Sequence, residues 1–369
     1  MSKARIMIAG MAVGLFCLTA AVPAGAVDFG SKLALHGYGN WAYGKTDGNS
    51  YINGNDEGTW DTMEFSLGVT ASPAENFTVH AQAFWEMAEA GTESSMDFAF
   101  AEYAVSPAFA LRAGRVKQPF GIYTEIFDVG VLYPFNNLPQ GIYGPSGFVA
   151  EGYMGVGATG ALDFTGKLRL QYDLYGGEVE SALTTPWAEV EGAADGDEQS
   201  TDVQNMVGGR VLVGAPDGTY TVGVSAYTGT VDTKSAGEEA EGDRHTAVGA
   251  QAELMLSAFT LRAEYAHQNA ESYSANAAYA EGSYLITPHW LVALRYDWTK
   301  VDPDEAPEVD SELLESTDIG VALNYIVNPF FVVKLAYHVV DGNRFTTANE
   351  ETALDEKTSL ITAGVSFSF

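Results

Sequence analysis

Apolar and polar residues alternate strictly along several runs of this chain, and the alternation limits the possible folds more than any other feature. Successive side chains of a β-strand point to opposite faces, so each run predicts a strand with one apolar and one polar face. The runs are about ten residues long, which is enough to cross a bilayer at a tilt and about twice the usual length of a soluble strand. They span 167–174, 219–227, 290–299, 331–339 and 361–369.

The connections between these runs alternate between short and long. Seven short turns rich in Pro, Gly, Asp, Asn or Ser are predicted at 72–76, 106–109, 163–166, 215–218, 256–259, 287–290 and 328–330. Eight longer polar connections lie near 44–58, 88–95, 118–150, 177–204, 231–243, 268–274, 301–315 and 341–357. These connections predict sixteen strands, with both termini on the short-turn side. A soluble sandwich or propeller has shorter strands and lacks this asymmetry, so we expect an all-β, antiparallel transmembrane barrel.

The chain ends in the sequence ITAGVSFSF, without the polar tail that most soluble domains carry. One row of this last run is apolar up to the final residue, and the other row is small and polar. We expect the apolar row to face lipid and the final strand to close the barrel against the first, near 33–44. The apolar row consists of Ile361, Ala363, Val365, Phe367 and Phe369.

The first 26 residues are typical of a cleaved export signal. Lys3 and Arg5 precede an apolar stretch that ends in the small residues of AVPAGA. A retained membrane helix is the alternative, but the stretch is short and no stop-transfer charges follow it. The single cysteine, Cys17, lies inside the signal, so the mature chain, 27–369, has no thiol for a disulfide or for catalysis.

The composition narrows the class of protein further. Removal of the signal leaves 16 basic residues against 49 acidic ones, a net charge of −33 that excludes nucleic acid as a partner. No stretch after the signal approaches the ~18 apolar residues that a membrane helix needs. An exported chain with 40 glycines and 12 % aromatic residues is either a soluble periplasmic β protein or an outer-membrane barrel.

Two short segments resemble outer-membrane porins. The terminal strand that ends in Phe367 and Phe369 is similar to the assembly signal that the insertion machinery reads in these proteins. The stretch LRAGRVKQPFGIYTEIFD, 111–128, resembles phosphate-selective porins, in which a basic strand runs into a Pro-Phe-Gly turn. The resemblance implies a sixteen-stranded and usually trimeric diffusion channel in the outer membrane of a Gram-negative bacterium, surrounded by outer-membrane lipids and lipopolysaccharide.

The longest connection, 118–150, corresponds in this resemblance to the third loop, which folds into the lumen and narrows it. Its composition agrees, because many of its residues are apolar and need a surface to pack against. The alternative is a loop that covers an interface between protomers. Its only charged residues are Glu125 and Asp128, which we expect at the constriction.

Five basic residues fall on the polar rows of predicted strands. A charge that faces lipid at mid-depth costs about 2–4 kcal/mol, so these side chains are expected to line the lumen and to set ion selectivity opposite the loop. Arg262 and Arg295 could instead be neutralised by Glu264 and Asp297, two residues further along the same face. The five residues are Arg169, Arg210, Arg262, Arg295 and Lys334.

The basic residues before the longest connection give conflicting signals. If Leu111 and Ala113 face lipid, Arg112 points into the lumen, and Arg115 and Lys117 point outward unless a bulge intervenes. In the reverse register, Arg112 reaches the interface with its long side chain. The motif resemblance places Arg115 and Lys117 near the constriction, and we expect them there on that ground.

The long connections are strongly acidic, and 302–315 carries seven carboxylates without a basic residue. A solvated, repulsive rim is the simplest interpretation. Weak binding of Ca²⁺ or Mg²⁺ that bridges to lipopolysaccharide is the alternative. The spacing does not match an EF-hand loop, so we predict no defined metal site. An acidic rim attracts cations and a basic lumen attracts anions, which leaves the sign of the selectivity open.

Catalysis has no support in the sequence. The six histidines lie in different strands or turns without metal-binding spacing, and no catalytic motif or cofactor site is present. We expect a porin that forms a water-filled channel for passive diffusion of ions and small polar solutes. The alternatives are a channel selective for phosphate or another oxyanion, which needs a continuous basic track, and a structural barrel that does not conduct.

Overall fold

The computed structural model describes residues 27–28, 32–88, 91–144, 147–179, 200–235, 238–240, 244–270, 273–304, 311–347 and 354–369. The predicted signal peptide, 1–26, lies outside these residues, as do large parts of the acidic connections 177–204 and 301–315. Among the described residues, no helix is long and apolar enough to span a membrane.

Sixteen long antiparallel strands form a closed barrel, as the sequence predicted. They belong to one sheet of 18 strands, whose other two members are the short segments β1 (Val27–Asp28) and β12 (Glu238–Ala240). The barrel strands are β2 (Leu33–Thr46), β4 (Thr59–Ala74), β5 (Phe77–Ala88), β6 (Gly91–Ser106), β7 (Phe109–Lys117), β8 (Gly152–Phe164), β9 (Leu168–Val179), β10 (Ser200–Gly214), β11 (Tyr220–Ser235), β13 (Arg244–Leu256), β14 (Phe259–Asn269), β15 (Tyr273–Thr287), β16 (Trp290–Pro303), β17 (Glu315–Asn328), β18 (Phe331–Asp341) and β20 (Lys357–Ser368).

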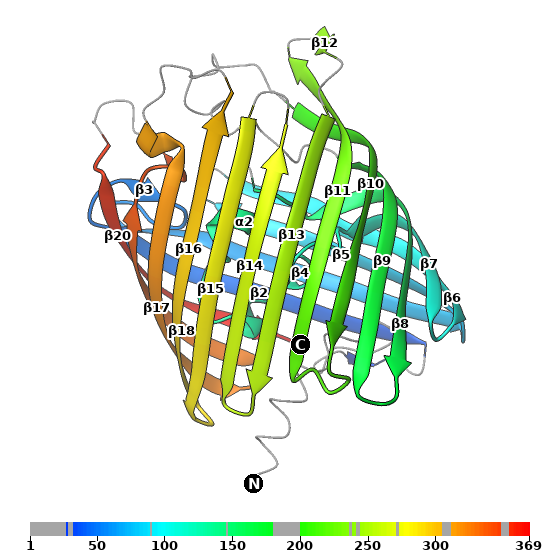
Figure 1. Cartoon of the computed structure of the whole chain (residues 1–369). Coiled ribbons are helices and arrows are strands. Elements are labelled where there is room, and N and C mark those ends of the chain that lie inside the picture. Colours follow the sequence, from blue (N-terminus) through cyan, green and yellow to red (C-terminus); the bar gives the residue numbers. More distant parts are fainter. Residues whose placement is uncertain are drawn as a thin grey trace.

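Each barrel strand pairs with its neighbours in the chain, and β20 pairs with β2 to complete the ring. Short turns join the strands at one end of the barrel and long connections at the other, and the turns that follow β8, β13 and β15 lie at the lower end in Figure 1. Several strands extend further into the long connections than the sequence suggested. For example, β6 already begins at Gly91, inside the expected loop 88–95. At the long-loop end of the barrel, the strands continue beyond the membrane into water. Their outward residues there do not need to be apolar, so the alternating pattern ends before the strand does.

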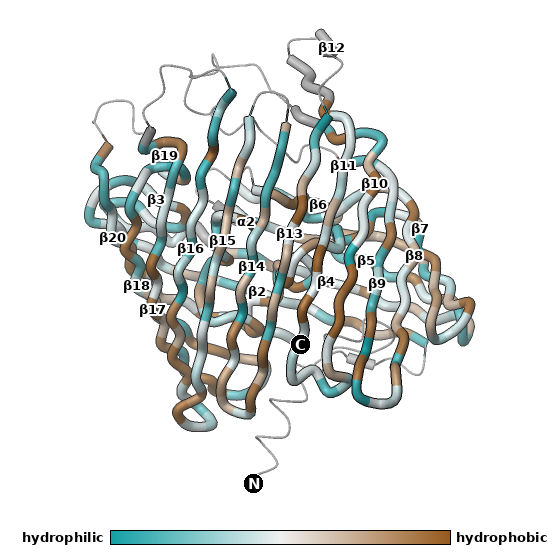
Figure 2. The backbone as a smooth tube through the Cα atoms, viewed as in Figure 1, coloured by the Kyte–Doolittle hydropathy of each residue, from teal (hydrophilic) through white to brown (hydrophobic). Residues whose placement is uncertain are grey.

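Side chains alternate between an outer and an inner face along the strands. In β18, Val333, Leu335 and Tyr337 are exposed on the outside, whereas Lys334 and His338 are buried on the inside. Hydrophobic and hydrophilic residues therefore follow one another along the tube in Figure 2. The outer row buries its apolar surface in lipid, which is the arrangement that a transmembrane barrel requires.

The outer row of the last strand packs over glycines of the first. Phe369 exchanges two backbone hydrogen bonds of 3.0 Å with Gly37. The rings of Phe369 and Phe367 occupy the space that a Cβ atom at Gly37 or Gly39 would need. The two terminal aromatic residues thus cover the seam at which the barrel closes.

The connection between β7 and β8, which we call the inner loop (118–151), lies inside the barrel. It contains two short 3₁₀ helices, η1 (Thr124–Ile126) and η2 (Gly130–Leu132), and the helix α2 (Gln140–Tyr143), which appears between the barrel walls in Figure 1. The largest cluster of buried apolar residues joins this loop to the inner wall and includes Phe120, Ile142, Tyr175 and Tyr227. The core of the molecule is therefore a contact between the inner loop and one side of the lumen.

A second, two-stranded sheet forms among the long connections, where β3 (Ser50–Tyr51) pairs with β19 (Thr346–Thr347). Side-chain hydrogen bonds from Asn49 to Asn343 and to the backbone of Asp355 join the same two connections. The first and last long connections thereby hold each other beside the closing seam.

Candidate pore site

One end of the inner loop is tied to the wall by a cluster of charged groups. Lys117, the last residue of β7, forms ion pairs through Nζ with Asp97 at 2.5 Å, with Glu151 at 2.6 Å and with Asp128 at 3.3 Å. Gln82 on β5 donates to both Asp97 and Asp128, at 2.6 and 2.9 Å. Because Asp128 and Glu151 belong to the inner loop while Asp97 belongs to the wall, the Lys117 ammonium joins the two parts.

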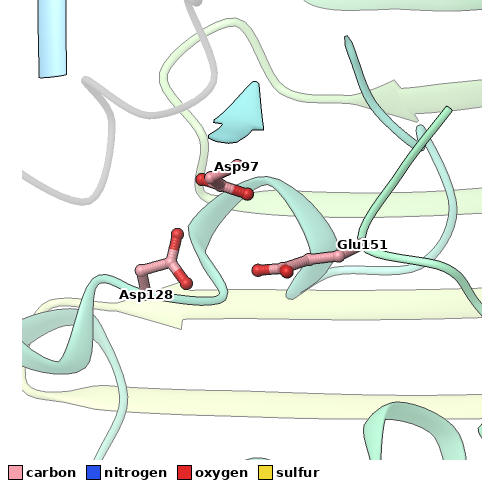
Figure 3. A group of neighbouring side chains, drawn as sticks. All are labelled: Asp97, Asp128 and Glu151. Atoms are coloured by element: carbon pink, nitrogen blue, oxygen red, sulfur yellow. The ribbon is translucent and has the colours of Figure 1, made fainter. Parts of the chain in front are cut away.

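The three carboxylates of this cluster are arranged as if around a cation. One ligand atom each of Asp97, Asp128 and Glu151 lies within 4.8 Å of the others, and the three side chains converge in Figure 3. The ammonium of Lys117 already supplies a positive charge among them. Burial raises the pKa of Asp128 to about 6, against the opposing effect of Lys117. A metal ion would have to displace Lys117, so the cluster is best described as an anchor for the loop.

The middle of the inner loop is held by two arginines of the wall. Arg210 on β10 donates to Asp173 at 2.9 Å and to Glu125 of η1 at 2.8 Å. Arg262 on β14 donates to Glu253 at 2.6 Å, and its Nη1 lies 3.3 Å from the Tyr123 hydroxyl. Both guanidinium groups therefore have carboxylate partners on the wall and contact the loop at the same time.

The carboxylates expected to neutralise Arg262 and Arg295 along their own strands have other partners. Glu264 accepts hydrogen bonds from the Tyr143 hydroxyl at 2.6 Å and from the backbone N–H of Ile122 at 2.8 Å. Asp297 accepts one from the backbone N–H of Gly141 at 3.2 Å. Neutralisation takes place between neighbouring strands instead, since directly opposite residues of a sheet lie closer than residues two apart on one strand.

The far end of the inner loop covers the remaining two predicted cations. Arg295 donates to the backbone oxygen of Asn137 at 2.8 Å and lies over the ring of Phe135. Lys334 donates to the backbone oxygens of Gly130 and Phe135, both at 2.7 Å. Each residue is only 1 % exposed, so these charges hold the loop and have little contact with the open lumen.

The other basic residues considered in the sequence analysis have different environments. Arg169 lies 3.5 Å from Asp163 and lines a cavity beneath the inner loop. Arg112 points inward and forms a 2.8 Å ion pair with Glu102. Arg115 pairs in the sheet with Ala99 and Met154, on the outward row, and donates to the backbone oxygen of Asp97. The position of Arg115 therefore follows the alternation and differs from the lumen position that the motif suggested.

The cavity beneath the inner loop extends along the wall from β7 to β14 toward the short turns. Its roof consists of loop residues that include Ile122 and Glu125, and its wall includes Gln171, Glu253 and several of the paired arginines. A cavity therefore remains between the inner loop and this side of the wall.

A row of three glutamates crosses the opposite wall. Glu64 on β4 lies directly opposite Glu86 on β5, which in turn lies opposite Glu93 on β6. Asn40 donates to Glu64 at 3.0 Å and also to the backbone of Asp128, which places this row on the inner face. None of the ion pairs between described residues involves these three glutamates. The row therefore brings three carboxyl groups together on one wall, without a basic residue among their ion-pair partners in the described part of the chain.

Several residues of the site were not predicted from the sequence. Asp97 faces inward because β6 has an irregular register, in which Phe98 pairs with Gln82 and Met96 with Ala83. Glu151 lies one residue beyond the predicted end of the loop. The glutamates at 64, 86 and 93 are far enough apart in the chain that only the strand register brings them together. Alternation alone could have assigned Glu64 to an inner row, but it could not have identified Glu86 and Glu93 as the residues beside it on the next strands.

Comparison with known proteins agrees with this architecture. A model of the family "Phosphate-selective porin O and P" matches residues 202–369, which form β10 to β20. An anion-selective porin from Comamonas acidovorans is 12 % identical, with a TM-score of 0.56 over 91 % of this chain and 99 % of that one. OmpF of Salmonella typhi, in complex with daunomycin, is 13 % identical, with a TM-score of 0.57 over 93 % and 100 %. OmpT of Vibrio cholerae in a trimer form is 9 % identical, with a TM-score of 0.54 over 91 % and 99 %.

No curated protein sequence matches this chain. The chain therefore has the sixteen-stranded barrel fold of these outer-membrane porins. Within that class, the chain resembles the phosphate-selective porins through its C-terminal part.

Proposed function

We propose that this porin is a passive channel for ions and small polar solutes, that the inner loop forms its constriction, and that it prefers cations. The observation that carries the preference is the row of Glu64, Glu86 and Glu93, which has no ion-pair partner among the described residues. Fixed charges on the wall of a narrow aqueous passage raise the local concentration of the opposite ion.

The paired state of the arginines supports the same sign. Arg112, Arg210 and Arg262 each contact a wall carboxylate within 3 Å, so their charge is largely balanced. Arg295 and Lys334 are covered by the inner loop. An oxyanion channel needs a continuous track of accessible basic groups. The basic groups named above are paired or covered by the loop, which favours a channel that prefers cations.

The role of the inner loop as a constriction is supported by its anchors. Its contacts reach β5, β10, β14, β16 and β18, so it extends across the lumen. Glu125 and Asp128 of the loop both form ion pairs with residues of the barrel strands. These contacts support a position of the loop inside the lumen rather than over an interface between protomers.

The sign of the selectivity can be measured directly. In planar bilayers under a KCl gradient, the refolded protein is expected to show stepwise conductance and a cation-selective reversal potential. The combined variant Glu64→Gln, Glu86→Gln and Glu93→Gln should lower the K⁺/Cl⁻ permeability ratio several-fold, most clearly at low salt, where screening is weak. Glu75→Gln, in an exposed short turn, is the control and should leave the ratio unchanged.

Two results would contradict this proposal. An anion-selective reversal potential in the unaltered protein would show that the basic residues set the ion selectivity, and it would favour oxyanion transport. Absence of conductance from a correctly folded barrel would favour a structural role.

We also propose that the barrel assembles as a homotrimer in contact with lipids and lipopolysaccharide, and that Phe367 and Phe369 form its assembly signal. The trimer form of the Vibrio cholerae protein and the exposed terminal aromatic row support this. Deletion of Phe369 should reduce insertion into vesicles that contain the insertion machinery more than it reduces unassisted refolding in detergent. The mass of the inserted unaltered protein should correspond to three chains. An equal loss in both assays would indicate a role in barrel closure alone.

A further inference from the structure

Each arginine that lines the cavity beneath the inner loop has a carboxylate partner. The positive charge of the wall is therefore balanced pair by pair, and the cavity has little net charge to attract a small ion of either sign. The pairs are Arg112 with Glu102, Arg169 with Asp163, Arg210 with Asp173 and Glu125, and Arg262 with Glu253.

The pair on β13 and β14 keeps hydrogen-bonding capacity toward the cavity. Glu253 lies directly opposite Arg262 and contacts its Nε atom through Oε2, at 2.6 Å. The Nη1 atom of Arg262 lies 3.3 Å from the Tyr123 hydroxyl. A carboxylate accepts through two oxygens and a guanidinium has five N–H donors, so this pair places a further acceptor and a further donor side by side.

A buried acceptor without a partner lies beside this pair. Gln251, which also lines the cavity, is two residues before Glu253 on the inner row of β13. Its Oε1 atom is buried and has no hydrogen-bond partner among the described residues. Buried polar atoms of this kind are normally satisfied by water or by a ligand.

Apolar groups complete this part of the cavity. Leu212 and Gln251 both border the space that a Cβ atom at Gly223 would need, so their side chains are neighbours. Ile122 of the inner loop lines the cavity, and its backbone N–H donates to Glu264, the residue directly opposite Gln251. Polar and apolar groups therefore meet around one small volume.

The size of the cavity limits the solute that it can hold. Its volume is about 140 Å³. Protein cavities of similar volume hold molecules about as large as benzene, so a solute of a few carbon atoms fits.

We propose that this part of the cavity binds small polyols, which are uncharged solutes with hydroxyl groups on adjacent carbons. The hydroxyl groups donate to Oε1 of Gln251 and to Glu253, and one of them accepts from Arg262. The carbon atoms pack against Leu212 and Ile122. The site deepens the proposed channel, on which it rests, by naming a class among the small polar solutes.

Binding to the refolded full chain in detergent tests the site without requiring conductance. The probe is erythritol, which has a hydroxyl group on every carbon. Its matched control is 1,4-butanediol, which has the same carbon chain but no adjacent hydroxyl groups. Titrations followed by saturation-transfer NMR should give an affinity for erythritol that is about tenfold higher, because butanediol leaves polar groups of the site unpaired.

Two variants separate the site from general effects on the barrel. Gln251→Met keeps the length of the side chain, removes the acceptor and should lower the affinity for erythritol several-fold. Asn324→Leu is the matched control and should leave the affinity unchanged. Oδ1 of Asn324 is also a buried acceptor without a partner among the described residues, but it lies on β17, outside the cavity.

Four results would overturn the proposal. They are an absence of saturable erythritol binding to the folded barrel, equal affinities for erythritol and 1,4-butanediol, an unchanged affinity in Gln251→Met, and tighter binding of erythronate than of erythritol. Erythronate carries a carboxylate on a similar chain, so its preference would assign the cavity to anions.

Single-channel recording of the same preparations keeps the two proposals distinguishable. If the protein conducts but does not bind erythritol, the channel proposal stands and the polyol site fails. If the protein binds erythritol selectively but does not conduct, the binding site stands and the channel proposal fails.

Discussion

Lys117→Met is expected to release one end of the inner loop from the wall and to give a channel with larger and noisier conductance. The ammonium of Lys117 contacts three carboxylates within 3.3 Å in a buried environment. Removal of one partner from a buried ion pair leaves uncompensated charge and costs about 3–5 kcal/mol. The measurements are single-channel recording and protease cleavage within 118–135.

A control and a rescue make this prediction specific. Lys300→Met removes a pair that is almost half exposed, and exposed pairs contribute about 0–1 kcal/mol, so its effect should be small. Without Lys117, the carboxylates of Asp97, Asp128 and Glu151 are free to bind a hard cation. Added Ca²⁺ should therefore reduce the current noise of the Lys117→Met channel and should leave that of the unaltered channel unchanged. An unchanged conductance in Lys117→Met would show that other contacts alone hold the loop.

Gly114→Ala is expected to be the most disruptive single-methyl change in β7. Gly114 has a φ of +129°, in the region that favours glycine, and a Cβ atom there would overlap the backbone oxygen of Ala99. The combined strain and overlap should destabilise the barrel by about 2–4 kcal/mol. Thermal or denaturant unfolding of the refolded protein measures this loss.

The matched control is Gly282→Ala on the outer face of β15. Gly282 does not have a positive φ, and its Cβ would meet one side-chain atom, of Leu261, at 3.2 Å. Its effect on stability should be much smaller than that of Gly114→Ala. If the two variants lose similar stability, the backbone conformation at Gly114 is not the reason that β7 needs glycine there.

The path of β7 also explains where the sequence-based expectations for the basic segment succeeded and failed. Alternation predicted that Arg112 points inward and that Arg115 does not, and the structure places both residues in this way. The same alternation assigns Lys117 to the outside, yet its side chain is buried among carboxylates of β6 and the inner loop. Lys117 is the last residue of its strand, where its long side chain can reach the loop that follows.

The carboxylate partners of the arginines illustrate a similar limit. The sequence places Arg210, Arg262 and Arg295 on inward rows because charge is excluded from lipid. It could not identify Asp173 or Glu253 as partners, since these depend on which residues of neighbouring strands lie opposite. The glutamate row depends on register in the same way.

The amino-acid sequence by itself therefore determined the class of fold, the number of strands, the closing seam and the direction of most side chains. These properties follow from the two-residue period of a strand and from the large difference in solvation between lipid and water, which act on each strand locally. Only the tertiary structure decided which charges meet, where the inner loop attaches and which wall is left acidic. Those features depend on register and on contacts between residues far apart in the chain, and a one-residue shift in register would change every one of them.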